Sequence, residues 1–155
     1  MLYDSVTVNH WLGLTRGVYM PHLFALQGPG NCGKSDTLIR LFHALQTKYP
    51  SATIQALHSG TKDIAVIMRG VNGLAVGIES QGDPNSRLKR SLPAFAAAKC
   101  DIIFCACRTS GMTVDWINAL SAAYIIHFVA QTVVANNHGA TNDATAALLM
   151  QRAGI

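Results

Sequence analysis

The chain alternates short apolar runs with segments in which apolar residues recur every three or four positions. The first pattern is typical of buried β-strands, and the second is typical of helices that pack one face on a sheet. Strands are predicted at residues 22–27, 53–57, 64–69, 74–79, 101–108 and 123–130. Helical segments separate most of these strands, so the pattern predicts an α/β fold.

The helices are marked by their ends as well as by their periodicity. The apolar face of the first helix consists of Leu38, Leu41, Phe42 and Leu45. Pro50 ends this pattern. Asp83-Pro84 has the form of an N-cap followed by proline at the first helical position, and it predicts a second helix to about residue 98 that Pro93 kinks or breaks. Two more helices are predicted at residues 113–122 and from Thr141 onward.

One turn signal interrupts this alternation. Asn72-Gly73 lies between two apolar runs, and this dipeptide is favoured where both central residues of a tight turn need a positive φ. Residues 64–69 and 74–79 are therefore predicted to form an antiparallel hairpin. We expect a three-layer α/β arrangement in which helices cover both faces of a mostly parallel sheet that contains this one hairpin.

The domain organisation follows from the same pattern. Residues 20–155 are enough to bury a substantial core and are predicted to form one domain. Residues 1–19 fit the alternation poorly, and we interpret them as an N-terminal arm of unclear role. Tyr3 and Trp11 in this arm suggest that it packs on a surface.

Composition narrows the class of protein. Half of the residues are hydrophobic and 13% are charged, which excludes a disordered chain. The formal charge of +4 suits a phosphate-bearing ligand. The aromatic residues are not interleaved with the basic ones, so nucleic acid is not the expected partner.

The cysteines and the apolar runs bear on the cellular location. Cys32, Cys100, Cys105 and Cys107 form no C-x-x-C pair, so we expect a reduced setting. Cys105 and Cys107 lie two residues apart in a predicted strand, and we expect buried thiols there rather than a metal or redox pair. The sequence holds no apolar run of 18 residues and no signal-peptide pattern. We therefore expect a cytoplasmic protein that does not enter a membrane.

The most specific motif in the chain lies between the first strand and the first helix. Residues 28–35, GPGNCGKS, match G-x-x-x-x-G-K-[ST]. Glycines let backbone N–H groups approach a phosphate closely, and the start of the helix adds unpaired N–H groups and the positive end of its dipole. The stretch resembles the Walker A motif of the P-loop NTPase superfamily, and this resemblance implies a P-loop NTPase fold for residues 20–155.

The resemblance also implies roles for the loop residues. Lys34 would contact the β- and γ-phosphates, Ser35 would bind Mg²⁺ through its hydroxyl group, and the amides from Asn31 to Asp36 would surround the phosphates. The residues expected to bind the nucleotide are consecutive: Gly28, Pro29, Gly30, Asn31, Cys32, Gly33, Lys34, Ser35 and Asp36.

A carboxylate is also needed beside the metal, and the chain has few candidates. Ligands of open α/β sheets bind beyond the carboxyl ends of the strands. Asp63 and Asp101 precede their strands, so we assign them to the opposite end of the sheet, away from the ligand. Asp36, Asp115 and Asp143 fall in predicted helices and Asp4 in the arm, so Glu79 and Asp83 remain. Glu79 ends a run that resembles a Walker B strand, and residues 79–82, ESQG, resemble the D-x-x-G segment of the GTPase branch. We expect Glu79 to bind the metal with Ser35, while Asp83 is either an N-cap or a second acid of the site.

Positive charge is needed to stabilise the phosphoryl group during its transfer. Arg108 follows a predicted strand, so it is expected either to contact phosphate or an acceptor substrate, or to pack at the start of a helix. Arg87, Lys89 and Arg90 resemble the cationic lid of small-molecule kinases, although a solvated helix face is the commoner explanation for such residues. His127 lies within an apolar strand and is expected to be a core histidine rather than a base.

The predicted function is binding of ATP with Mg²⁺, followed by hydrolysis of ATP or transfer of its γ-phosphoryl group to a small molecule. Adenine is favoured because the late strands end in CRTSG and VAQTV, which do not resemble the guanine-binding N-K-x-D pattern. Lys34, Glu79, Asp83 and Arg108 are the expected catalytic residues. The alternative is a nucleotide-dependent switch, in which residues 79–82 sense the γ-phosphate and a partner reads the state.

Overall fold

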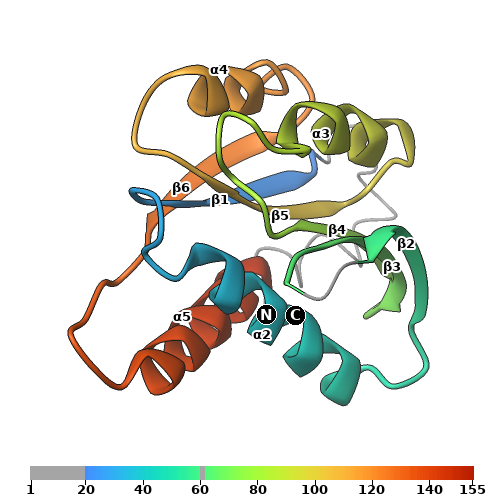
Figure 1. Ribbon diagram of the computed structural model, residues 1–155. Coiled ribbons are helices and arrows are strands. Elements are labelled where there is room, and N and C mark those ends of the chain that lie inside the picture. Colours follow the sequence, from blue (N-terminus) through green and yellow to red (C-terminus); the bar gives the residue numbers. More distant parts are fainter. Residues whose placement is uncertain (1–19, 60–61) are drawn as a thin grey trace.

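The computed structural model describes residues 20–59 and 62–155, in which six strands form a single sheet with helices on both of its faces (Figure 1). The strands are β1 (His22–Gln27), β2 (Thr53–Ser59), β3 (Ile64–Val71), β4 (Leu74–Glu79), β5 (Ile102–Cys107) and β6 (Ile125–Ala130). The helices are α2 (Lys34–Lys48), α3 (Leu88–Ala97), α4 (Met112–Asn118) and α5 (His138–Ala153). The arm expected at residues 1–19, with Tyr3 and Trp11, lies outside the described residues.

The sheet has the strand order β2-β3-β4-β5-β1-β6 and is mixed. β1 pairs in parallel with β5 and β6, and β4 pairs in parallel with β5. β3 pairs antiparallel with β4 on one side and with β2 on the other. Half of the sheet is therefore an antiparallel meander and the other half is parallel.

This arrangement corrects the predicted fold. The expectation of a P-loop NTPase fold with a mostly parallel sheet and one hairpin is wrong, because β2, β3 and β4 form two successive antiparallel pairs. The sequence showed only the Asn72-Gly73 turn, where both residues do have positive φ angles of 53° and 80°. The reversal between β2 and β3, whose sequence includes Ser59-Gly60, was not recognised as a hairpin.

Two helix starts also differ from the expectation. Asp83 does not cap a helix, because its carbonyl oxygen accepts a hydrogen bond from the amide of Ser86 in a turn, and α3 begins only at Leu88. α5 begins at His138 after Asn137, which has a φ of 58°, rather than at Thr141. Pro93 lies inside α3, which is nevertheless one continuous helix from Leu88 to Ala97.

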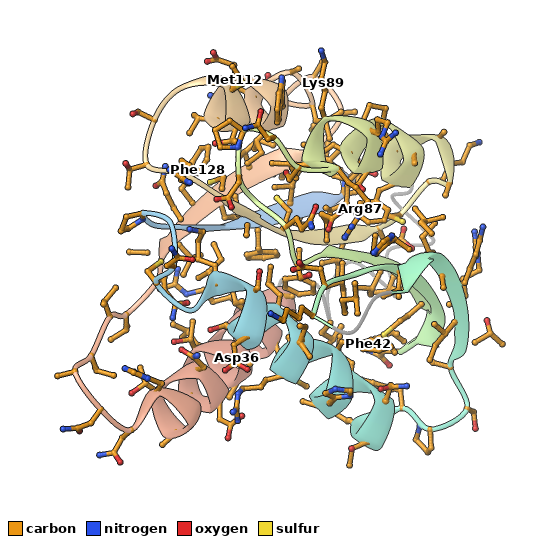
Figure 2. All side chains as sticks on the ribbon, viewed as in Figure 1. Asp36, Phe42, Arg87, Lys89, Met112 and Phe128 are labelled. Carbon is orange, nitrogen blue, oxygen red and sulfur yellow. The ribbon has the colours of Figure 1, made fainter. Side chains whose placement is uncertain are left out.

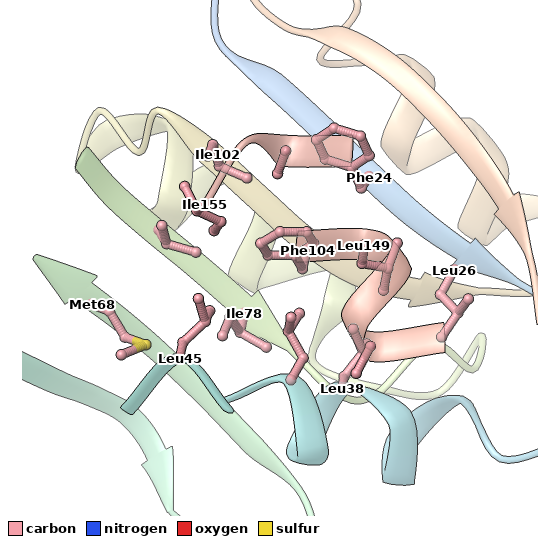
Figure 3. Packing of buried hydrophobic residues seen from close by; sticks show 14 of the residues in the cluster. Phe24, Leu26, Leu38, Leu45, Met68, Ile78, Ile102, Phe104, Leu149 and Ile155 are labelled. Atoms are coloured by element: carbon pink, nitrogen blue, oxygen red, sulfur yellow. The ribbon is translucent and has the colours of Figure 1, made fainter. Parts of the chain in front are cut away.

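The core has two layers, one on each face of the sheet. On one face, Leu38 and Leu45 of α2 and Leu149 of α5 pack against Phe104 and Ile78 (Figure 3). On the other face, α3 and α4 cover a second cluster that includes Leu92, Phe95, Leu23, Ile103 and Ile117. Across residues 20–59 and 62–155, no helix has the length and apolar character needed to cross a membrane.

Three of the four cysteines belong to this second layer. Cys100, Cys105 and Cys107 are buried and free, which confirms the expectation of buried thiols at Cys105 and Cys107. Burial raises the pKa of the Cys107 thiol to about 11, although the nearby charge of Lys34 acts in the opposite direction. Such a thiol is protonated at neutral pH and is a poor nucleophile.

His127 lies on the sheet beside a second histidine. Its Nε2 atom is 2.9 Å from Nδ1 of His22, and its ring stacks on Phe24 with the ring centroids 4.5 Å apart. Burial, followed by the charge of His127, lowers the pKa of His22, and burial, followed by the charge of Arg152, lowers the pKa of His127. The hydrogen bond between the rings needs one nitrogen without a proton, so the geometry suits two neutral rings and supports a structural role for His127.

This pair predicts a loss of stability in mild acid. Because the folded pKa of each ring is below its unfolded value of about 6.5, the unfolded chain binds more protons as the pH falls through that value. We expect the free energy of unfolding to decrease between about pH 7 and pH 5. Urea denaturation at several pH values should show a flatter dependence for His127→Gln than for the wild type, and equal slopes would contradict this role.

Candidate functional site

The loop of residues 28–33 joins the end of β1 to the start of α2 at one edge of the sheet. The carboxyl ends of the parallel strands β1, β4, β5 and β6 meet at this edge. Asn31 and Gly33 have φ angles of 55° and 99°, and a glycine suits the second position because a Cβ atom there would lie 3.1 Å from both Asn142 and Gln131. Gly33 is also the N-cap residue of α2 and has no side chain to cap the first turn. The amide groups of that turn are therefore oriented towards the loop, as in anion-binding helix starts.

The Lys34 side chain forms hydrogen bonds within the loop. This side chain is buried, and Nζ donates hydrogen bonds to the carbonyl oxygens of Gly28 at 2.8 Å and Pro29 at 2.5 Å. The thiol sulfur of Cys32 lies 3.7 Å from the same nitrogen. The structure thus places a fixed positive charge at the centre of the predicted phosphate loop.

Ser35 lies opposite an acid that sequence reasoning had excluded. Its hydroxyl group is 2.8 Å from the carbonyl oxygen of Ser80 and 3.2 Å from Oδ1 of Asp63. The same carboxylate accepts hydrogen bonds from the Ser80 hydroxyl group at 3.0 Å and from Nε2 of the Gln81 side chain at 3.2 Å. Asp63 is therefore a residue of the candidate site.

The exclusion of Asp63 failed because it ignored the direction of β3. In an antiparallel pair the start of one strand lies beside the end of its neighbour, and Ala65 of β3 is paired with Glu79 at the end of β4. Asp63 thus lies at the same edge as the carboxyl ends of the parallel strands. The predicted hairpin already contained this signal, since it reversed the direction of residues 64–69.

Glu79 is turned away from this edge. Its side chain is fully buried, and it forms an ion pair with Arg87 at 2.9 Å and a hydrogen bond with the Ser91 hydroxyl group. Successive side chains of a strand point to opposite faces, so Ile78 packs against α2 and α5 while Glu79 faces α3. The predicted role of Glu79 as a metal ligand has no support in this placement, because Glu79 does not line the pocket that contains Ser35 and Asp63.

The residues of the expected cationic lid, Arg87, Lys89 and Arg90, also lie away from the pocket beside the loop. Figure 2 shows Arg87 close to the sheet and Lys89 on the outer side of α3. Arg87 is paired with Glu79, and Lys89 and Arg90 are exposed. None of these three side chains lines the pocket beside the loop.

Asp83 and Arg108 do meet in the pocket. Nε of Arg108 is 2.9 Å from Oδ1 of Asp83, and both side chains are partly exposed. The guanidinium group also lies against the loop, because a Cβ atom added to Gly30 would be 2.9 Å from Nη2 of Arg108. The backbone amide of Arg108 donates a hydrogen bond to the hydroxyl group of Thr113 in α4 at 3.1 Å, which agrees with packing at the start of a helix. Contact of Arg108 with phosphate or an acceptor stays a prediction.

The remaining loop residue, Asp36, is held by its neighbours. Its carboxylate forms an ion pair with Arg40 at 2.7 Å and accepts a hydrogen bond from Asn142 at 2.8 Å. Burial raises the pKa of Asp36, but the hydrogen bonds from Asn142 and Arg40 outweigh it, so the pKa lies below its ordinary value. The side chain is therefore occupied, and its backbone amide is the part available to a ligand.

Two hollows flank the loop. The larger, of about 660 Å³, is lined by Lys34, Ser35, Asp63, Asp83 and Arg108, among others. The smaller, of about 370 Å³, lies between the loop and the segment that follows β6, with Val133, Val134 and His138 in its wall. Residues 31–33 and Asp36 line both hollows, so a ligand lying across the loop could extend into each of them.

Gly82 fixes the wall of the larger hollow. A Cβ atom at this position would lie 2.3 Å from the backbone carbon of Ala106 in β5, a distance that no packing adjustment of a side chain can relieve. We expect Gly82→Ala to displace residues 80–86 and to reduce stability by several kcal/mol, as overpacking against backbone does. Thermal unfolding should show a lower midpoint for Gly82→Ala, whereas Gly73→Ala retains room for its Cβ atom and tests only the cost of a positive φ. Equal midpoints for Gly82→Ala and the wild type would contradict the packing argument.

Comparison of the chain with protein-family models, with curated proteins and with solved structures gave no match. The resemblance of residues 28–35 to a Walker A motif therefore stays a prediction, and the candidate site rests on its own geometry.

Proposed function

We propose that this protein binds ATP with Mg²⁺ at the loop of residues 28–35 and either hydrolyses the nucleotide or transfers its γ-phosphoryl group. The observation that carries the proposal is the convergence on one hollow of a buried ammonium group, a hydroxyl group and a carboxylate, those of Lys34, Ser35 and Asp63. The four free cysteines agree with the reducing cytoplasm expected for such a protein.

The loop supplies the features that bind a polyphosphate. The first turn of α2 presents amide groups and the positive end of the helix dipole, and Gly33 leaves that turn without a competing side-chain cap. Lys34 adds a full positive charge. In this structure the ammonium group donates hydrogen bonds to two uncharged acceptors, the carbonyl oxygens of Gly28 and Pro29. Charged phosphate oxygens are stronger acceptors for the same N–H groups.

Ser35 and Asp63 fit the requirements of Mg²⁺. This ion prefers oxygen ligands and is commonly held by one or two carboxylates together with substrate phosphates and water. The Ser35 hydroxyl group and the Asp63 carboxylate are 3.2 Å apart and border the same hollow as Lys34. When bound there, Mg²⁺ would neutralise charge on the β- and γ-phosphates. Asp63 thus replaces Glu79 as the proposed metal-binding acid.

The smaller hollow suits the nucleoside. Its wall combines the apolar side chains of Val133 and Val134 with the His138 ring, and a base needs apolar faces on which to lie. The one carboxylate in this wall is Asp36, which is already engaged by Arg40 and Asn142. A guanine would need a free carboxylate for its N1 and N2 donors, so this lining favours adenine.

Calorimetric titration of ATP, with Mg²⁺ and with EDTA, tests the proposal. We expect Lys34→Ala to weaken binding by about 10- to 100-fold, the value of one or two hydrogen bonds to a charged group. Asp63→Asn should reduce the gain in affinity that Mg²⁺ provides by roughly tenfold or more. GTP in place of ATP should bind more weakly.

Two variants serve as controls for these titrations. Asp115→Asn removes an exposed carboxylate of α4 that lies outside both hollows, and it should bind ATP as the wild type does. Glu79→Gln removes the partner of a largely buried arginine, so it should lower the free energy of unfolding by about 3 kcal/mol without removing the effect of Mg²⁺. Failure of the wild type to bind either nucleotide would refute the proposed function.

A switch is the second candidate, and one chain of hydrogen bonds favours it. Asp63 connects Ser35 to the Gln81 side chain, whose carbonyl oxygen accepts from the amide of Arg87 at 3.3 Å. Arg87 in turn binds Glu79, the residue beside Ser80. A change at Ser35 can therefore reach the start of α3 through direct contacts.

The switch predicts a difference between nucleotide states. Hydrogen exchange of residues 79–90 should be slower with ATP than with ADP, because only the triphosphate reaches the hollow that Gln81 and Gly82 border. Gln81→Ala should reduce this difference by breaking the connection between Asp63 and Arg87. Identical exchange in the two states would exclude the switch and leave ATP binding untouched.

A further inference from the structure

The larger hollow offers more than a nucleotide needs. If the nucleoside occupies the smaller hollow, only the terminal phosphates and the metal enter the larger one, whose volume of about 660 Å³ is in the range of complete small-molecule sites. The part of the wall that the loop does not form, which we call the far side, consists mainly of residues 81–86 and Arg108. It borders the same hollow as Lys34 and Ser35, beside which the γ-phosphate would lie.

Two opposite charges stand at this far side. Arg108 and Asp83 form an ion pair at 2.9 Å, and their side chains are 39% and 60% exposed. A pair as exposed as this contributes little to stability, since water screens it and competes for both groups. An anionic ligand can therefore take the place of Asp83 beside Arg108 at little cost.

Hydrogen bonds fix the backbone of Arg108, although a ligand can replace Asp83 beside its side chain. Its amide donates to Thr113, and its carbonyl oxygen accepts from the side chain of Gln27 at 3.3 Å. The guanidinium group lies against Gly30 of the loop. Nε alone contacts Asp83, so the fork of the guanidinium group can bind a carboxylate or phosphate group with two hydrogen bonds.

We propose that the far side of this hollow is an acceptor site for a small hydroxylated compound that carries a carboxylate or phosphate group. This inference rests on the proposed function and selects phosphoryl transfer over hydrolysis. The anionic group of the acceptor binds Arg108, and this exchange releases the Asp83 carboxylate. The neutral lining of the same wall, which includes Gln81, Asn85 and Ser86, suits the other hydroxyl groups of such a compound.

The reaction follows from these positions. The acceptor hydroxyl oxygen attacks the γ-phosphorus atom, a new P–O bond forms, and the bond from that phosphorus atom to the β,γ-bridging oxygen breaks. ADP carries away the electron pair of the broken bond, and the hydroxyl proton passes to Asp83. The products are ADP and a phosphate ester of the acceptor. Lys34 stabilises the negative charge of the transferred group, while Arg108 holds the anionic group of the acceptor.

The test uses the full chain with Mg²⁺ and ATP, and phosphorus NMR to follow ADP and any new phosphate ester. Glycerate and gluconate represent carboxylates, glucose 6-phosphate and ribose 5-phosphate represent phosphates, and glycerol and glucose are the uncharged counterparts. We expect an ester from at least one anionic compound and none from its uncharged counterpart. The group of compounds that reacts shows whether the anionic group of the acceptor is a carboxylate or a phosphate.

Variants of Arg108 and Asp83 separate binding of the acceptor from transfer of its proton. Arg108→Gln should raise the KM of the acceptor about tenfold or more, Arg108→Lys should recover part of this loss, and neither should change the Kd of ATP measured by calorimetry. Asp83→Asn should lower kcat about 100-fold, as expected for loss of a general base. Arg90→Gln removes an exposed arginine of α3 outside the hollow and is the matched control.

Each remaining outcome overturns a defined part of the proposal. ATP binding with only ADP and inorganic phosphate as products, or equal reaction of charged and uncharged compounds, refutes the acceptor site and leaves the proposed function standing. Absence of ATP binding refutes both.

Discussion

The antiparallel register between β3 and β4 determines which side chains reach the predicted phosphate loop. This register pairs Ala65 with Glu79, and it is extended by hydrogen bonds that join Ser80 to the amide and the carbonyl oxygen of Ile64. Asp63, the residue before β3, is thereby brought next to Ser80 and Ser35. The alternation of side chains along β4 sends Glu79 to the opposite face. A shift of β3 by one residue against β4 would move every side chain of β3 to the other face of the sheet.

Hydrogen bonds from the segment after β6 also support the loop, independently of the pairing between β3 and β4. The Gln131 side chain, which follows β6, accepts a hydrogen bond from Thr37 of α2 and donates one to Asn142 of α5. Asn142 in turn binds Asp36. These buried polar groups satisfy one another and lie against Gly33, so they fix the point where the loop becomes a helix. The packing of α2 on α5 and the shape of the loop are therefore parts of one arrangement.

Local features of the sequence predicted the structure well, and features that depend on pairing did not. Residues 22–27 and 74–79 are strands with the expected bounds, and the turn at Asn72-Gly73 has the expected positive φ angles. These features need only a few adjacent residues. The antiparallel partner of β3 on its other side could not be recognised, because an edge strand such as β2 shows no local sign of its direction. The mixed sheet follows from that one missed pairing.

The errors at the site have the same origin. Glu79 was chosen because it ends an apolar strand, but the face on which its side chain lies depends on α3, whose Arg87 and Ser91 surround it. Asp63 was rejected because the exclusion did not apply the reversal of direction that the predicted hairpin implied for its strand. Asp83-Pro84 has the form of a helix start, yet contact with Arg108 and the turn to Ser86 determine its conformation. In each case a tertiary contact overrides a local preference.

The wall around Asp83 combines one rigid contact with one exchangeable contact. Gly82 lies so close to the backbone of Ala106 that no other residue fits, and this contact fixes where residues 80–86 cross the end of β5. The next side chain, Asp83, is held only by a partly exposed ion pair. A rigid backbone keeps the carboxylate near the loop in every state, while the weak ion pair lets it change partners. This division suits the proposed transfer site, because a general base at Asp83 would need a fixed position before the substrate arrives and a free charge only afterwards.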